Sequence, residues 1–281
     1  MGRKRKADEC NQVVVVSDTH CGCRLGLCPA SGVDLDDGGH YSPSRVQRAV
    51  WAYWQEFWDV WVPHVTKGEP FDVVFNGDAL DGVHHGSTTQ VSHNMEDQLK
   101  LGIACLGPVA ARARRYYHIR GTEAHVGKSA VYEETLARTL GAVPNEDGQF
   151  ARWDLWLRVG GHLTHFLHHI GTTGSSAYEA TAVHKEMTEE FVEAGRWGVE
   201  PPQVVVRSHR HRYFKGEVLG DKGYCISVVS PAWQGKTPFV WKIPGARLSQ
   251  PQFGGLLIRR GEDELYTRSR VWTIERSREV G

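Results

Sequence analysis

The 281-residue sequence predicts an α/β fold in which two packed β-sheets carry helices on their outer faces. Short apolar runs of strand length alternate with segments of helical periodicity through the first half of the chain. The second half consists mainly of strand pairs that read as hairpins, around one long helix. This order favours a single domain, which we place at residues 13–281, behind a disordered basic tail at residues 1–12.

Three buried strands are expected in the first half, and a polar loop follows each of them. Residues 13–16 are four consecutive valines, a β-branched run typical of a fully buried strand. Residues 71–75 and 116–119 are the next two apolar runs of strand length. Open α/β sheets place their ligand groups beyond the carboxyl ends of such strands, so a functional site is expected in the loops that follow them.

Three helices are expected between and after these strands. Ser42, which a proline follows, reads as an N-cap, and the helix that it starts is expected to end near Pro63. A second helix is expected over residues 95–113, interrupted or ended by the Gly-Pro pair at 107–108. A third covers residues 131–140, and the next residue, a glycine, is its expected C-cap.

The second half is expected to form a hairpin, a long helix and further strands. Residues 153–159 and 162–167 read as two strands joined by a Gly-Gly turn. A helix is expected over residues 177–194, and residues 203–207 form another buried strand. The remaining strands are expected near residues 213–218, 224–229, 255–260 and 265–271.

Composition limits the class of protein without naming a partner. The chain has 33 Lys and Arg against 33 Asp and Glu, so no global basic excess indicates nucleic acid. No apolar stretch reaches the roughly 20 residues of a membrane span. The six cysteines have no export signal beside them, which favours reduced thiols. We therefore expect a cytoplasmic protein with no membrane partner, and the oligomeric state stays open.

Candidate metal ligands follow five of the expected strands. A lone aspartate or histidine after a strand is usually a turn or cap residue, but five such strand ends are hard to assign to turns alone. Carboxylates mixed with imidazoles suit Mn, Fe, Zn, Co or Ni better than Mg or Ca. The ligands outnumber what one ion uses, so we expect two divalent ions, manganese first, bridged by a carboxylate. In chain order the candidates are Asp18 and His20, Asp78, Glu123 and His125, His168 and His169, and His209 and His211.

The order of these residues resembles the motifs of the calcineurin-like metallophosphoesterase superfamily. The resemblance extends over residues 13–229, and its first two motifs match fully. It implies a four-layer αββα sandwich, with two mixed β-sheets flanked by helices, that hydrolyses phosphate esters with two metal ions. The stretches that carry it are Asp18-Thr19-His20, Gly77-Asp78 with Asp81, Gly121 to His125, His168-His169 and His209-Arg210-His211.

The resemblance also implies two metal positions with Asp78 as the bridge. The first ion would take its ligands from the first and last motifs, namely Asp18, His20 and His211. The second ion would take His209, a residue of the third motif and one of the pair His168 and His169. Asp81 and Arg210, which belong to the same motifs, are expected to contact the substrate.

The third motif departs from the family pattern. Thr122-Glu123-Ala124-His125 replaces the expected Asn-His pair. Glu123 is expected to supply the missing ligand oxygen, and His125 is expected to protonate the leaving group as the catalytic imidazole. Alternatively, Glu123 is a carboxylate at the start of a helix and has no role in metal binding.

Three functions stay open. The first is a phosphodiesterase or phosphomonoesterase that uses a hydroxide bridging two metal ions. The second is a DNA or RNA nuclease on the same fold, which clustered basic residues favour. The third is a non-catalytic binding module; the retained ligands argue against it, and the altered third motif keeps it open. The basic residues are those of the N-terminal tail, Arg112, Arg114 and Arg115, and Arg207, Arg210 and Arg212.

Overall fold

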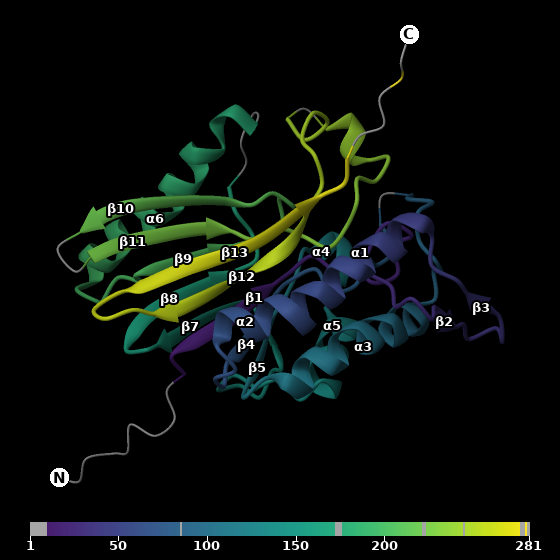
Figure 1. Cartoon of the computed structure of the whole chain (residues 1–281), viewed down its shortest axis with the longest axis horizontal. Coiled ribbons are helices and arrows are strands. Elements are labelled where there is room, and N and C mark those ends of the chain that lie inside the picture. The colour runs from purple at the N-terminus through teal and green to yellow at the C-terminus, as the bar shows by residue number, and fades with distance from the viewer. Residues whose placement is uncertain are drawn as a thin grey trace.

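The computed structural model describes residues 10–84, 86–171, 176–220, 223–243, 245–275 and 279 of the chain. Within these residues, two β-sheets pack face to face and helices cover both outer sides (Figure 1). The folded region begins earlier than expected, because Cys10 is buried and Gln12 opens the first strand. The rest of the predicted basic tail, residues 1–9, lies outside the described residues.

In the described part of the chain, the larger sheet has six strands. In spatial order they are β13 (Leu265–Thr273), β12 (Gln252–Arg260), β1 (Gln12–Val16), β4 (Asp72–Asn76), β5 (Tyr116–Ile119) and β6 (Ala151–Arg152). Strands β1, β4, β5 and β6 are parallel, and β12 is antiparallel to β1. Val13 pairs with Asp72, and Val73 pairs with Tyr116, so β1, β4 and β5 end at one edge of the sheet.

The smaller sheet is also mixed. Its strands among the described residues are, in spatial order, β10 (Phe214–Gly220), β11 (Gly223–Val229), β9 (Val204–Arg207), β8 (His162–Leu167) and β7 (Asp154–Val159). The predicted hairpin of β7 and β8 is confirmed, and β8, β9 and β11 are parallel. A short antiparallel ribbon, β2 (Val33–Asp34) with β3 (His40–Tyr41), lies outside both sheets.

The helices form the two outer layers. They are α1 (Arg45–Glu56), a π-helical turn (Phe57–Trp61), α2 (Val62–Thr66), α3 (Met95–Arg112), α4 (Glu123–Val126), α5 (Val131–Thr139) and α6 (Glu179–Trp197), with 3₁₀ turns at Ser176–Tyr178 and Val240–Lys242. Helices α1, α3 and α5 pack on the larger sheet, and α6 packs on β10 and β11 (Figure 1). None of the described helices is long and apolar enough to cross a membrane.

Alternate side chains of β1 face different layers, as the pleat of a strand requires. Val13 and Val15 pack in the core between the two sheets, whereas Val14 and Val16 pack in the core under the helices. This explains why a run of four valines is buried on both faces. The predicted αββα sandwich is confirmed.

Three helix boundaries beside prolines differ from the prediction. Ser44, not Ser42, is the N-cap of α1, because Ser44 and Gln47 form a capping box. Pro63 does not end a helix but lies in the first turn of α2, where its missing N–H is not needed. Pro108 lies inside α3, which continues past it for one more turn.

Candidate metal centre

The predicted ligands converge where strands of both sheets end. The Asp18 N–H donates to the Gly77 carbonyl (2.9 Å), which joins the loops after β1 and β4. The Ser208 N–H donates to the His168 carbonyl (2.9 Å), which joins the loops after β8 and β9. Asn76 connects the two sheets, since its Nδ2 donates to Ser208 Oγ (2.7 Å). Side chains from five strand ends therefore meet in one place.

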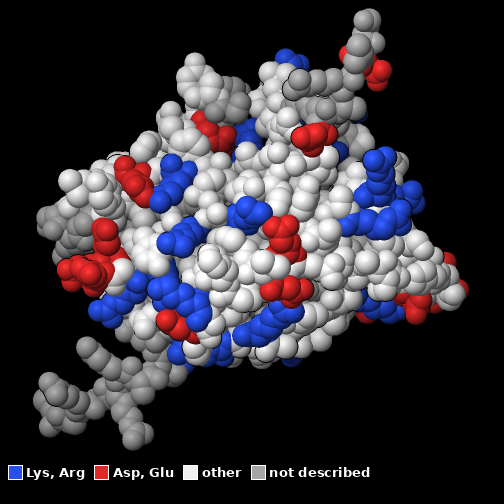
Figure 2. All heavy atoms as spheres, in the orientation of Figure 1, with Lys and Arg blue, Asp and Glu red and all other residues white. Residues whose placement is uncertain are grey.

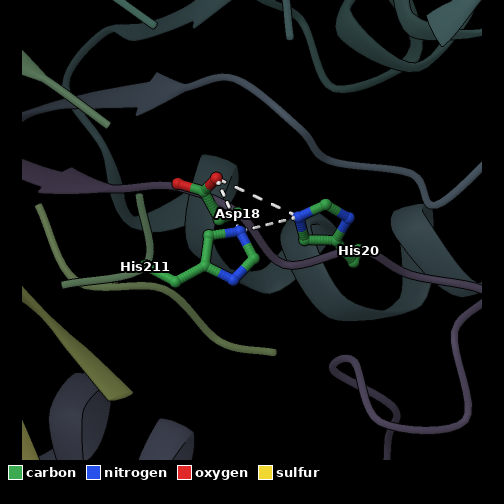
Figure 3. A group of neighbouring side chains, drawn as sticks. All are labelled: Asp18, His20 and His211. Atoms are coloured by element: carbon green, nitrogen blue, oxygen red, sulfur yellow. Dashed lines mark hydrogen bonds and ion pairs between the residues drawn. The ribbon is translucent and has the colours of Figure 1, made fainter. Parts of the chain in front are cut away.

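The first cluster consists of Asp18, His20 and His211 (Figure 3). Nε2 of His211 lies 3.2 Å from Asp18 Oδ1, and Nε2 of His20 lies 4.0 Å from the same oxygen. The two Nε2 atoms are 3.1 Å apart. Both rings turn a nitrogen toward the carboxylate (Figure 3), and Asp18 and His20 are buried. The three predicted ligands of the first ion are thus brought together.

The second cluster consists of Asp78, His168 and His209. Nδ1–H of His168 donates to the Asn76 carbonyl (2.7 Å), which directs Nε2 to Asp78 Oδ2 at 3.0 Å. Nδ1 of His209 lies 3.9 Å from the same oxygen. Nε2 of His20, in the first cluster, is also 3.9 Å from Asp78 Oδ2. Asp78 therefore lies between the two clusters, where a bridging carboxylate is expected.

His168 and His169 differ in position, and this difference indicates which of the two can be a metal ligand. His168 is fully buried in the second cluster. The His169 side chain is exposed, and its ring lies beside that of His209, with centroids 5.5 Å apart. Of the pair, the geometry favours His168 as the ligand.

Asp81, which was expected to contact a substrate, is buried and supports a histidine of the first cluster. It is buried, with Oδ1 3.4 Å from Nδ1 of His20. Nε2 of Gln90 donates to Oδ2 (2.9 Å), and Nε2 of Gln234 donates to Oδ1 (3.2 Å). A carboxylate behind a ligand imidazole orients the ring and fixes its tautomer.

His125 lies at the edge of both clusters. Its Nδ1–H donates to the Asp81 carbonyl (2.7 Å), and its Nε2 lies 4.0 Å from Asp78 Oδ2. Its ring makes an edge contact with that of His20, with centroids 4.4 Å apart. The side chain keeps 15% exposure, so solvent or a substrate can reach it.

In the third motif, Thr122 takes the position that was expected for Glu123. The N–H of Thr122 donates to Asp78 Oδ1 (2.7 Å), and its hydroxyl lies 2.8 Å from both carboxylate oxygens. Glu123 is exposed and belongs to neither cluster. It is the first residue of α4, with Thr122 as its N-cap, so the alternative role at a helix start fits its position better.

Arg210 does not extend toward the clusters as a free cation. Its Nη1 pairs with Glu179 Oε1 (3.3 Å), and Arg212 pairs with the other oxygen of Glu179 (2.9 Å). The Arg210 side chain is 8% exposed. One end of its guanidinium is thus engaged by Glu179, and its expected contact with a substrate stays a prediction.

The backbone of the ligand residues is strained. Seven non-glycine residues of the described chain have positive φ, and five of them are predicted ligands. Such conformations are uncommon outside glycine and concentrate at functional sites. The five are Asp18 (φ 54°), His20 (41°), Asp78 (55°), His209 (72°) and His211 (57°).

Two glycines let the loops approach this closely. A Cβ on Gly77 would lie 2.3 Å from Nδ1 of His168, and a Cβ on Gly121 would lie 2.0 Å from Oδ1 of Asp78. Gly77 also has φ of 92°. Neither position has room for a side chain beside the ligands.

Solved structures resemble the chain in fold, whereas no protein-family model and no curated protein matches it. A Vps29 double mutant from Entamoeba histolytica is 9% identical, with 94% of this chain and 99% of that chain covered and a TM-score of 0.41. The sulfate thiohydrolase SoxB from Thermus thermophilus is 11% identical (96% and 58% covered, TM-score 0.42). A 5'-nucleotidase from Candida albicans is 8% identical (94% and 52% covered, TM-score 0.36).

The order of the strands and the ligand groups at their ends agree with the motifs quoted above. The two mixed sheets with helices on their outer faces form the αββα sandwich that the resemblance implied. The chain spans only 58% of SoxB and 52% of the nucleotidase. At these identities and TM-scores the similarity carries over no activity.

Charges and protons in the centre compensate one another. Burial raises the pKa of Asp78, but the charges of His168 and His125 hold it well below its ordinary value. Burial lowers the pKa of His168, but the charge of Asp78 outweighs this and raises it to about 10. Burial lowers the pKa of His20 to about 4. A proton on His168 thus balances the carboxylate, as a cation would.

The residues of the first cluster fit a divalent transition-metal ion. Oδ1 of Asp18 is buried, and the contact from His211 at 3.2 Å lacks hydrogen-bond geometry. A buried carboxylate oxygen without a hydrogen-bond partner destabilises the fold unless a cation or a hydrogen-bond donor binds it. Two imidazoles and a carboxylate form a donor set typical of Mn, Fe, Zn, Co and Ni.

Some supporting residues were missed from the sequence. Gln90 and Gln234 hold Asp81 from segments that carry no motif, so no signal in the sequence indicated them. Asn76 directly precedes Gly77-Asp78, and its place at the end of a buried strand was an available signal. Its carbonyl orients His168 and its side chain connects the two sheets.

Proposed function

We propose that this chain is a metal-dependent hydrolase of phosphate esters. The position of Asp78 carries the proposal, because its Oδ2 lies within 4.0 Å of imidazole nitrogens from both clusters. A carboxylate between two ligand sets is what a dinuclear site needs. Strained backbone at the ligand residues supports the same function.

The two clusters would hold one ion each. Asp18, His20 and His211 would bind the first, and His168 and His209 the second, with Asp78 between them. Bound divalent ions, manganese first, would activate a water molecule and offset the charge of the phosphoryl oxygens. Thr122 would fix the orientation of Asp78 through its N–H and hydroxyl.

His125 is placed to move a proton. Its Nδ1–H is engaged by the Asp81 carbonyl, so Nε2 is the atom that takes up and releases a proton. Nε2 faces Asp78 Oδ2 at 4.0 Å. From this position His125 would protonate the leaving oxygen of an ester.

The arginines that favoured a nuclease are engaged elsewhere. Arg114 makes two hydrogen bonds of 2.9 Å to Asp72, at the end of β4 that lies away from Asp78. Arg207 pairs with two glutamates of α6, at 2.8 Å each. On the face drawn in Figure 2, basic and acidic side chains are interspersed. These arginines therefore give no support to a nuclease.

Metal analysis combined with turnover tests the proposal. The full chain is stripped with a chelator, reloaded with Mn²⁺ and assayed on bis-p-nitrophenyl phosphate and p-nitrophenyl phosphate. We expect two ions per chain and hydrolysis of at least one ester. One ion or none after loading would contradict the dinuclear site. Two ions without turnover of either ester would favour the non-catalytic binding module.

Asp78→Asn is the matching variant. An amide cannot neutralise both ions, so we expect loss of hydrolysis and of bound metal while the thermal unfolding of the chain stays cooperative. Asp37→Asn, at an exposed turn outside the clusters, is the control and should hydrolyse like the wild type. Near-wild-type turnover in Asp78→Asn would remove Asp78 from the bridge.

A further inference from the structure

The segment between β11 and β12 carries three cations, no acidic side chain and two exposed aromatic rings. Residues 231–251 include Lys236, Lys242 and Arg247 and no Asp or Glu. Phe239 is 49% exposed and Trp241 is 57% exposed. In contrast, tryptophans of α1 and of the π-helical turn after it are buried, since Trp54 and Trp58 in the core are each 3% exposed. Phe239 and Trp241 thus add little to the fold, unlike Trp233 of the same segment, which is fully buried in the core.

Both ends of this segment are attached beside the metal centre. The Trp233 N–H donates to the Asp18 carbonyl (2.9 Å). The side chain of Gln234 donates to Asp81 (3.2 Å). Further along, Nη1 of Arg212 donates to the Gly245 carbonyl (3.1 Å), directly after the ligand His211. Residues 236–243 therefore form a loop whose two ends are held beside the site. Figure 1 shows this loop in yellow-green.

Cations and exposed aromatic rings lie close together in the sequence of this loop. Nζ of Lys236 lies 4.0 Å from the centroid of the Trp241 ring and also donates to the Arg247 carbonyl. This cation–π contact steadies the ring while more than half of Trp241 stays accessible. Lys242 and Arg247, which follow Trp241 in the sequence, are also exposed. One short segment thus contains both cations, which can bind phosphates, and exposed aromatic rings, on which bases can stack.

We propose that residues 236–243 bind a single-stranded nucleic acid and present its phosphodiester to the metal centre. This inference rests on the proposed phosphoesterase function and names its substrate class. Bases would stack on Trp241 and Phe239, and Lys242 and Arg247 would contact the backbone phosphates. Stacking on aromatic rings tolerates any base, so the loop would give affinity without sequence preference.

Binding to a labelled oligonucleotide tests this directly. The full chain is titrated, with chelator and no metal, against fluorescein-labelled dT12, and anisotropy is measured. Trp241→Ala should weaken binding by about 5- to 150-fold, the range found for loss of one base stack. Trp197→Ala is the matched control, because Trp197 is 76% exposed at the far end of α6, and its affinity should stay within about twofold.

Salt dependence tests the charges separately. Removing two phosphate contacts in Lys242→Gln with Arg247→Gln should reduce the slope of log Kd against log salt by about 1.4. Three results would each overturn the proposal. The wild type does not bind dT12, Trp241→Ala binds dT12 as tightly as the wild type, or the wild type binds dT12 no more tightly than thymidine monophosphate.

The two proposals fail in different ways. Oligonucleotide binding is measured without metal, so an enzyme that binds dT12 and hydrolyses no ester after Mn²⁺ loading refutes the phosphoesterase function. An enzyme that hydrolyses bis-p-nitrophenyl phosphate and does not bind dT12 refutes the nucleic-acid substrate. Hydrolysis of the dT12 strand that weakens in Trp241→Ala and not in Trp197→Ala would support both.

Discussion

Thr122 and Glu123 are adjacent, yet only one of them contacts the metal centre. The hydroxyl and N–H of Thr122 hold both oxygens of Asp78, and Glu123 points to solvent from the first turn of α4. The residue type most able to bind a metal is therefore not the one that lies at the site. A threonine in this position acts through Asp78 by fixing its orientation.

Replacing each of these two residues should separate their roles. Thr122→Val removes the hydroxyl from Asp78, and we expect Mn²⁺ affinity to fall by about 10- to 100-fold, as for loss of other supporting contacts. Glu123→Gln should leave affinity and turnover unchanged. Competitive titration with a metal indicator measures both. Weaker metal binding in Glu123→Gln would indicate that Glu123 is a metal ligand.

His125 is accessible and touches both clusters without completing either. We expect His125→Ala to lower kcat by about 10²–10⁴, the usual range for loss of a general acid, with metal content unchanged. His64→Ala, an exposed histidine on α2, is the control and should retain full activity. Full activity in His125→Ala would exclude it from proton transfer.

At the scale of single elements, the start of α1 ties the loop after the first ligands to the helical layer. Gln47 completes the capping box with Ser44, and its Nε2 also donates to the Cys23 carbonyl (3.0 Å). Cys23 lies three residues after His20, so the helix start and the ligand loop are stabilised together. The prediction placed this cap at Ser42, because a following proline is a common sign of a first helical residue.

Ser44→Ala should lower the free energy of unfolding by about 1 kcal/mol, because the N–H of Gln47 loses its partner. Urea denaturation measures the change. Ser31→Ala is the control, since that exposed hydroxyl makes only a 3.4 Å contact with the next carbonyl. Equal stability of the two variants would mean that the capping box adds nothing to the fold.

For the whole molecule, the metal-free centre should make stability depend on pH. The folded pKa of His168, about 10, lies above its ordinary 6.5, so its contribution is complete below pH 6.5 and is lost as pH rises toward 10. The pKa of Asp78 is depressed, so its contribution is present above its ordinary 3.8 and is lost as pH falls further.

We therefore expect the chelated protein to lose stability as pH rises from about 6.5 to about 9, measured by urea unfolding. Mn²⁺ loading should reduce this loss, because a bound cation replaces the proton on His168. His168→Gln removes the titrating ring and should flatten the dependence for the chelated protein. A chelated wild type with constant stability over this range would contradict the charge balance described here.

The sequence alone predicted the sandwich and the edge at which the site lies. Both follow from local properties of the sequence. Apolar runs indicate strands that are buried on two faces, and the polar residues after these runs indicate where the strands end. Candidate ligands were predicted in this way, and those that the structure brings into the two clusters include Asp18, His20, Asp78, His209 and His211. Helix boundaries at Pro63 and Pro108 were predicted less well, because a proline is tolerated wherever its missing N–H is not needed.

Only the tertiary structure decided what each polar side chain contacts. His168 and His169 are equivalent in sequence, but one is buried beside Asp78 and the other is exposed. Arg210 and Asp81 lie in ligand motifs, yet a glutamate of α6 and two glutamines from distant segments engage them. The physical reason is that hydrogen bonds and ion pairs act over about 3–4 Å, and residues far apart in the chain reach that distance only once the sheets have packed.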